Sequence, residues 1–142
     1  MVRYQAQGTG RVFVVGLKRG ELLLESIVRT IEEEHIQNAI ITSAIGSLQK
    51  VVLHRVIGLG REPEDEFITL ERPMELASLQ GMIADGQPHF HMVVSDTQAA
   101  YTGHLENGTT VLYLAEITLL EIDGLSIARR KNEDNIATLV TR

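Results

Sequence analysis

The chain has 142 residues, 44% of them apolar, and a formal net charge of −6. This length and apolar content predict one globular domain, residues 1–142, and exclude a largely disordered chain. No apolar run approaches the roughly 18 residues of a membrane span, and an acidic chain with 4% aromatic residues is poorly suited to binding nucleic acid. The chain has no cysteine and its first residues lack the apolar core of a signal peptide, so we expect a cytoplasmic protein without disulfides.

The first two predicted elements are a strand and a helix. Residues 11–17 are rich in β-branched and aromatic residues, which is typical of a strand. A helix is predicted from about Glu21 to about His35, where a histidine suits the carbonyl end of the helix dipole. The apolar residues of this helix recur at helical spacing on one face and are Leu23, Leu24, Ile27, Val28 and Ile31.

The rest of the chain predicts strands, separated by a break at Gly46-Ser47 and a turn over residues 81–86. The longest apolar run surrounds Glu116 and indicates a strand covered on both faces. The basic run over residues 129–131 is expected to be a solvated chain end. One main helix with about seven or eight strands predicts an α+β fold with a largely antiparallel β-sheet. The strands expected after the helix cover residues 39–45, 51–57, 67–70, 75–83, 89–95, 99–102 and 111–122.

Three of the five histidines lie close together, at His89, His91 and His104. On a strand, His89 and His91 share one face and Phe90 points to the other. A hairpin that turns at residues 96–98 could return His104 to the same place. Three imidazoles with an open fourth position are typical of catalytic rather than structural zinc. The alternative is an ordinary polar strand face.

The length of the hairpin loop decides whether His104 joins the pair. A two-residue loop places His89 opposite His104, and a four-residue loop places His91 there. Directly opposed residues have Cβ atoms about 4.5–5.5 Å apart, so either register could let two imidazoles share an ion. A three-residue loop sends His104 to the other face unless Gly103 interrupts the strand, since strand glycines often mark a bulge or a close approach.

Metal-bound imidazoles generally need a carboxylate or carbonyl on the second ring nitrogen. Glu116 stands out because a carboxylate inside an apolar run needs a partner, unless it simply faces solvent. The remaining histidines, His35 and His54, are expected to be surface or hydrogen-bonded residues. The acids available to orient the histidines are Glu75, Asp85, Asp96 and Glu116.

The order and spacing of several short segments carry a family resemblance. It is strongest at Pro88-His89-Phe90-His91 with Ser95-Asp96, and at Gly103-His104-Leu105. The chain resembles the plants-and-prokaryotes-conserved (PPC) domain, a family of predicted DNA-binding proteins. The resemblance covers nearly the whole chain and also includes Arg19 to Leu23, Ser43 to Leu48, Glu75 to Gly81 and Ala115 to Ile117.

The resemblance implies a twisted antiparallel sheet assembled as a homotrimer. It also implies that His89, His91 and His104 bind a metal near a subunit interface. Plant members add an AT-hook with an Arg-Gly-Arg-Pro core, which this sequence lacks. Thr102 stands where many members have glycine, and Gln98-Ala99 replaces a turn that often contains glycine. Both departures bear on the geometry of the hairpin.

Three functions follow from these patterns. The leading hypothesis is a homotrimer that binds a divalent metal through three histidines, zinc first, with nickel, iron and copper also suited to imidazole. Water or a small-molecule ligand would fill the open position, although no reaction and no general base can be named. The second is a DNA-binding or transcription-associated protein, and the third is an assembly module with neither metal nor DNA. DNA binding would use the scattered basic residues Lys18, Arg19, Lys50, Arg55, Arg129, Arg130 and Lys131.

Overall fold

The computed structural model describes residues 1–142 as eight strands and one helix. This is an α+β fold dominated by antiparallel strands, as predicted. With 11 residues, α1 is too short to span a membrane. In chain order the elements are β1 (Gly8–Lys18), α1 (Leu23–Glu33), β2 (Asn38–Val56), β3 (Asp65–Ala84), β4 (Gln87–Ser95), β5 (Ala100–Leu105), β6 (Thr110–Asp123), β7 (Ile127–Lys131) and β8 (Ala137–Thr141).

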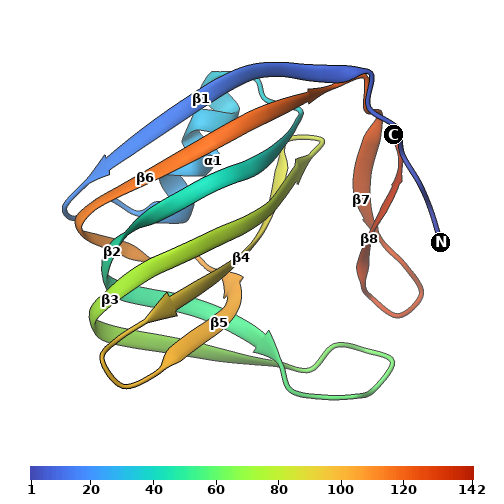
Figure 1. Cartoon of the computed structure of the whole chain (residues 1–142). Coiled ribbons are helices and arrows are strands. Elements are labelled where there is room, and N and C mark those ends of the chain that lie inside the picture. Colours follow the sequence, from blue (N-terminus) through green and yellow to red (C-terminus); the bar gives the residue numbers. More distant parts are fainter.

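Six strands form one sheet in the order β1-β6-β2-β3-β4-β5, and every pairing is antiparallel. Strand β5 also pairs with β2, so β2, β3, β4 and β5 close on themselves like a small barrel. The long strands β2 and β3 bend along their length and take part both in this closed region and in the open part of the sheet beside β6 and β1 (Figure 1). Strands β7 and β8 form a separate two-stranded sheet.

Two of the predicted breaks are wrong, because β2 and β3 are each one long strand. At Gly46 the strand β2 continues with a shift of register, and a Cβ atom there would lie 2.5 Å from the carbonyl oxygen of Leu114 on β6. This glycine therefore permits a close approach of two backbones rather than ending a strand. In β3, Pro73 lies at a register shift against β2, where a bulge accommodates the missing amide hydrogen.

The turn between β3 and β4 is shorter than predicted. Ala84 pairs with Gln87, which leaves only Asp85 and Gly86 in the loop. Both loop residues have positive φ, 54° and 72°, as a type I′ hairpin turn requires. Gly81, expected in this turn, belongs to β3.

Helix α1 buries Leu23, Ile27 and Ile31 in a single core shared with the main sheet. It begins later than Glu21 because Leu22 still forms a β-bridge with Thr110. Its end agrees with the prediction, since His35 adopts a left-handed conformation with φ of 56° immediately after the helix. The amide of Ile36 then donates to the carbonyl of Ile31, which completes a common helix-terminating motif.

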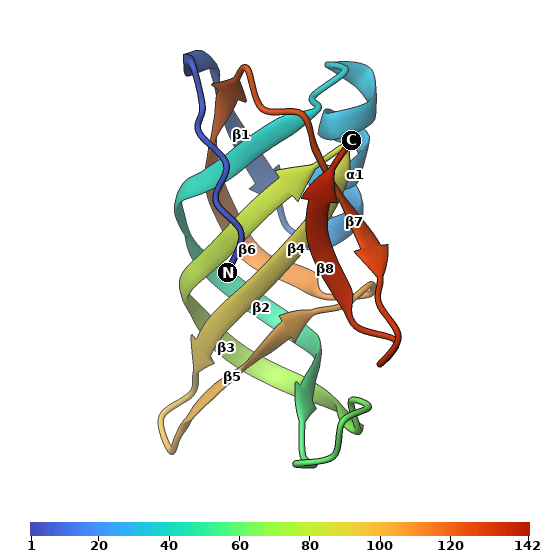
Figure 2. The same cartoon turned by 90° about the vertical axis from the view of Figure 1, so that its right-hand side faces the viewer.

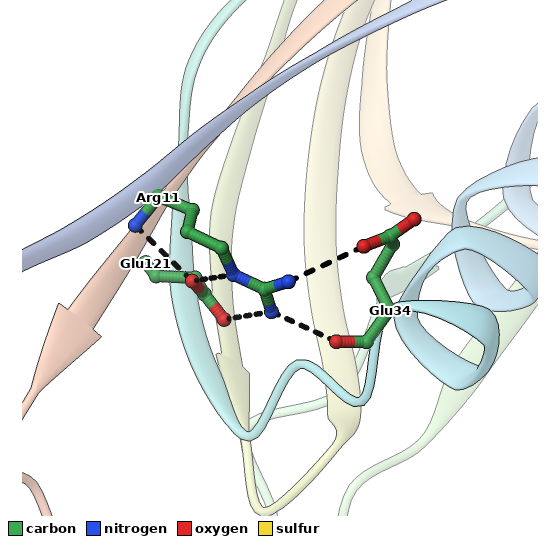
Figure 3. Close-up of polar contacts among 3 residues, drawn as sticks. All are labelled: Arg11, Glu34 and Glu121. Atoms are coloured by element: carbon green, nitrogen blue, oxygen red, sulfur yellow. Dashed lines mark hydrogen bonds and ion pairs between the residues drawn. The ribbon is translucent and has the colours of Figure 1, made fainter.

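Arg11 of β1 joins this helix end to the sheet (Figure 3). Its Nε lies 2.7 Å from Glu121 of β6, and its Nη2 donates to the carbonyl oxygen of Glu34 at 2.8 Å. A cation at the carbonyl end of a helix is favourable. The hydrogen bond from Arg11 also lowers the pKa of Glu121. Together these contacts fix the end of α1 against β1 and β6.

The basic run over residues 129–131 belongs to a strand rather than to a loose chain end, and of its residues Arg130 and Lys131 are exposed whereas Arg129 is half-buried. The run lies in β7, which pairs with β8 in a hairpin beside the main sheet and contacts β3 (Figure 2). Ile127 and Ala128 are fully buried, so β7 packs onto the protein. The turn between β7 and β8 is stabilised by Asn132, whose Oδ1 accepts hydrogen bonds from the amides of Asp134 and Ile136.

Candidate metal centre

The β4–β5 hairpin has a four-residue loop, residues 96–99, because Ser95 pairs with Ala100. This is the register that places His91 opposite His104. The loop contains no glycine, and Asp96 stabilises it instead. Its Oδ1 accepts hydrogen bonds from the amides of Gln98 at 2.7 Å and Ala99 at 2.9 Å. The departure from a glycine-containing turn therefore does not separate the histidines.

On its other side β5 pairs with β2, with His104 opposite His54. A Cβ atom on Gly103 would lie 2.5 Å from the carbonyl oxygen of His54 and 2.8 Å from a side-chain carbon of Leu53. Only glycine lets β5 approach β2 this closely. His104 is thereby held between His91 on one neighbouring strand and His54 on the other.

The nitrogens of His89, His91 and His104 include one ligand atom from each residue that lie within 4.8 Å of one another. The two Nε2 atoms of His89 and His91 are 3.2 Å apart. Two nitrogens bound to one tetrahedral zinc ion lie about 3.3 Å apart, so this pair already has the spacing that zinc requires. Phe90 between them is buried in the core. The residues fit a metal ion bound by three imidazoles.

The surroundings of the cluster favour neutral imidazoles. Burial lowers the pKa of His104 to about 4, and the neighbouring histidines and Arg129 add to this effect. Burial also lowers the pKa of His89, followed by the charge of Arg129. An imidazole must be neutral to bind a metal, so both residues are ready to act as ligands at neutral pH.

None of the four candidate acids makes a hydrogen bond to a histidine, and Asp85 pairs instead with Arg130 and Arg142. Asp96 binds the Nε of Arg72 at 2.6 Å in addition to its own turn. Glu75 is exposed and pairs with Ser95 at the far end of β4, where it and Asp96 line a hollow of about 300 Å³. Glu116 is exposed on β6, which agrees with the outward-facing alternative.

The acid nearest the cluster is Glu106, which the sequence analysis did not consider. Its Oε1 lies 2.6 Å from Nδ1 of His54, and the His54 ring stacks on the His104 ring with centroids 4.6 Å apart. His54 is thus hydrogen-bonded, as expected, but it also forms one wall of the cluster. The spacing of His104 and Glu106 could have indicated this, because residues i and i+2 of a strand share a face.

Arg129 is the other residue near the cluster that the sequence did not indicate. Its Nη1 donates to the carbonyl oxygen of Gln87 at 3.2 Å, two residues before His89 on β4. The side chain is half-buried, and burial lowers its pKa. Its charge contributes to the lowered pKa values of His89 and His104.

Several of the other basic residues proposed for DNA binding are paired with acids. Lys50 lies 3.4 Å from Glu71, and Arg55 lies 2.8 Å from Glu66. Arg130 lies 3.8 Å from Asp85. These pairs reduce the positive charge that could contact phosphates.

The Plants and Prokaryotes Conserved (PCC) domain, the family also abbreviated PPC, matches residues 4–123 of the chain. The chain belongs to this family. The resemblance found in the sequence is therefore confirmed, and the PCC domain covers everything from the start of β1 to the end of β6. The β7–β8 hairpin lies outside the matched residues.

Solved structures share this fold. A PPC protein from Pyrococcus horikoshii is 28% identical, with a TM-score of 0.79 over 100% of this chain and 99% of that one. A metal-containing protein from Archaeoglobus fulgidus is 25% identical, with a TM-score of 0.79 over 95% of each chain. A protein from Ralstonia eutropha, named as a candidate DNA-binding protein, is 23% identical, with a TM-score of 0.74 over 98% and 96% of the two chains.

Among curated proteins, the bifunctional protein GlmU of Synechococcus sp. (strain JA-3-3Ab) is 30% identical over 115 residues. The match covers 80% of this chain but only 18% of that protein. The chain thus spans less than a fifth of the length of the curated relatives it matches.

Proposed function

We propose that this PCC-domain protein binds a divalent metal ion through His89, His91 and His104. The observation that carries the proposal is the convergence of three ligand nitrogens within 4.8 Å of one another, on two paired strands of a closed sheet. The archaeal relative described as metal-containing supports it. Zinc is the first choice because three imidazoles leave one position open in its tetrahedral geometry, although nickel, iron and copper also accept imidazole ligands.

The open position would hold water or a group of a small-molecule ligand. His91 is exposed and the other two histidines are half-buried, so a solute can reach the cluster. A metal there would act as a Lewis acid on the bound group. His54 and Glu106 form the adjacent wall, where they keep the His104 ring in place through stacking.

Metal analysis of the untagged protein tests the proposal. We expect close to one metal ion per chain after equilibration with zinc, and less than a tenth of that in His89→Ala or His104→Ala. His35→Asn is the matched control, because His35 lies at the far end of α1 and asparagine tolerates its left-handed conformation. Zinc at a hundredfold excess over its Kd should stabilise the protein by about 2.7 kcal/mol in thermal unfolding. Protein that takes up no zinc, nickel, iron or copper contradicts the proposal.

We further propose that the chain assembles as a homotrimer. The outer face of β1, β6 and β2 supports this, because it exposes a group of apolar side chains: Val12, Val14, Ile45 and Leu114. Contiguous exposed apolar side chains commonly mark an interaction surface. Light scattering should give three times the 15.7 kDa chain mass, and Val14→Lys should lower it. A monomeric wild-type protein contradicts the trimer.

The second candidate function is DNA binding. It is supported by the name of the Ralstonia relative, while the net charge of −6 and the pairing of Lys50, Arg55 and Arg130 with acids oppose it. Fluorescence anisotropy with duplex DNA tests it. Affinity should fall steeply with added salt if phosphates are bound, and the absence of binding at low salt removes this candidate.

A further inference from the structure

The β7–β8 hairpin is fixed to the main sheet at both of its ends. At the base, Arg142 lies 2.9 Å from Asp85 in the β3–β4 turn. At the tip, Arg61 from the loop after β2 lies 2.9 Å from Asp134. Between these anchors β7 contacts β3, and the buried residues Ile127 and Ala128 hold it against the protein.

Arg129 occupies the middle of this anchored strand and differs from its basic neighbours. Arg130 and Arg142 both pair with Asp85, whereas Arg129 forms no ion pair and binds only the carbonyl oxygen of Gln87. A half-buried guanidinium without a carboxylate partner is suited to binding an anion through its free N–H donors. Its remaining N–H donors have no partner within the chain.

The histidine cluster beside Arg129 has no acid of its own. Three neutral imidazoles around a divalent ion leave a net charge of +2, and the nearest carboxylate, Glu106, is already bound to His54. Arg129 adds another positive charge on the side of His89. A site with this charge and an open coordination position favours an anion over a neutral ligand.

We propose that Arg129 and the metal form a binding site for a small oxyanion, the carboxylate or phosphate group of a small molecule. One oxygen of the group would occupy the open position on the metal held by the three histidines, and Arg129 would donate to another. The guanidinium suits this role because its fork of N–H donors matches the spacing of oxygens in carboxylates and phosphates. This inference rests on the proposed function, since it needs the metal, and it names the class of ligand for that site.

Calorimetric titration of the zinc-loaded full chain tests the inference, with acetate and inorganic phosphate as separate probes. We expect at least one of them to bind with a 1:1 stoichiometry, and the two titrations show whether a carboxylate or a phosphate is preferred. Arg129→Gln should weaken that binding at least about tenfold, and Arg129→Lys should weaken it less because it keeps the charge but loses the fork. Arg130→Gln is the control, since its side chain is turned toward Asp85.

Zinc content of the same samples separates the two proposals. Arg129→Gln should hold as much zinc as the wild-type protein, because no ligand has been removed. With zinc bound, the absence of oxyanion binding, or an equal loss in Arg130→Gln, overturns the oxyanion site and leaves the metal site intact. Failure of the wild-type protein to bind zinc or another divalent metal overturns both.

Discussion

The two hairpins that meet at the histidine cluster are built in different ways. The β4–β5 hairpin is bonded on both sides, to β3 and to β2, and its residues Phe90, Met92 and Leu105 belong to the core. The β7–β8 hairpin pairs only with itself and is attached mainly by Ile127, Ala128 and ion pairs near its ends. The proposed metal ligands thus lie on a rigid element, while Arg129 lies on one that can separate from the sheet at smaller cost.

The largest effect on stability and metal binding should follow from separating the β4–β5 hairpin from β2. In Gly103→Ala the new Cβ would collide with the carbonyl oxygen of His54, so β5 must move away from β2. We expect a loss of about 1–3 kcal/mol in the free energy of unfolding and a loss of most zinc binding. Urea unfolding and metal analysis measure the two effects.

Gly60→Ala is the matched control, because Gly60 lies in an exposed loop and a Cβ there would meet nothing closer than 3.5 Å. Its stability and zinc content should equal those of the wild-type protein. Full zinc binding in Gly103→Ala would show that the β2–β5 closure does not position His104.

A smaller effect should appear in the metal-free protein as the pH falls. The pKa of His104 is about 4 in the folded chain and 6.5 in the unfolded one, because burial disfavours the charged ring. Between these values the unfolded chain binds more protons, so stability rises with pH. The contribution is fully present above about pH 6.5 and is lost as the pH falls toward 4.

Urea midpoints measured across this range, with EDTA present, provide the test. His104→Gln should flatten the pH dependence, whereas His35→Asn should leave it unchanged. Hydrogen-exchange protection factors, which correct for the intrinsic pH dependence of exchange, should fall in β4 and β5 at low pH and remain constant in β7 and β8, which contain no histidine. An unchanged slope in His104→Gln would assign the acid sensitivity to another group.

The sequence predicted the fold class and the histidine cluster better than the path of the chain. The alternation of side chains along a strand and the number of residues in a hairpin loop can both be read from a short segment. They gave two registers that bring the histidines together, and one of these places His91 opposite His104, as observed. Gly46 was interpreted as a break, because a close approach between distant backbones leaves no local signal, and residues 71–74 were left between two predicted strands. The number of strands agreed only because two pairs of predicted strands are single strands, while β7 and β8 were not expected.

The partners of the site were harder to predict for the same reason. Glu106 reaches His54 only because β5 and β2 close the sheet, and that contact joins residues 52 positions apart. Arg129 precedes a turn signal at Asn132 to Asn135 that was overlooked, yet even a predicted hairpin would not have indicated which strand of the main sheet it contacts. The histidine cluster could be found from one hairpin, whereas its surroundings required the tertiary structure.

The smallest effect on stability should come from loosening the second hairpin alone. Arg61→Ala removes the ion pairs to Glu133 and Asp134 at its tip. Because Arg61 is largely exposed, we expect a change of less than about 1 kcal/mol in the free energy of unfolding. Hydrogen exchange should nevertheless increase over β7 and β8 while β4 and β5 stay protected, and zinc content should not change. Equal exchange increases in both hairpins would show that they open together, and Arg129 would then belong to the same rigid unit as the histidines.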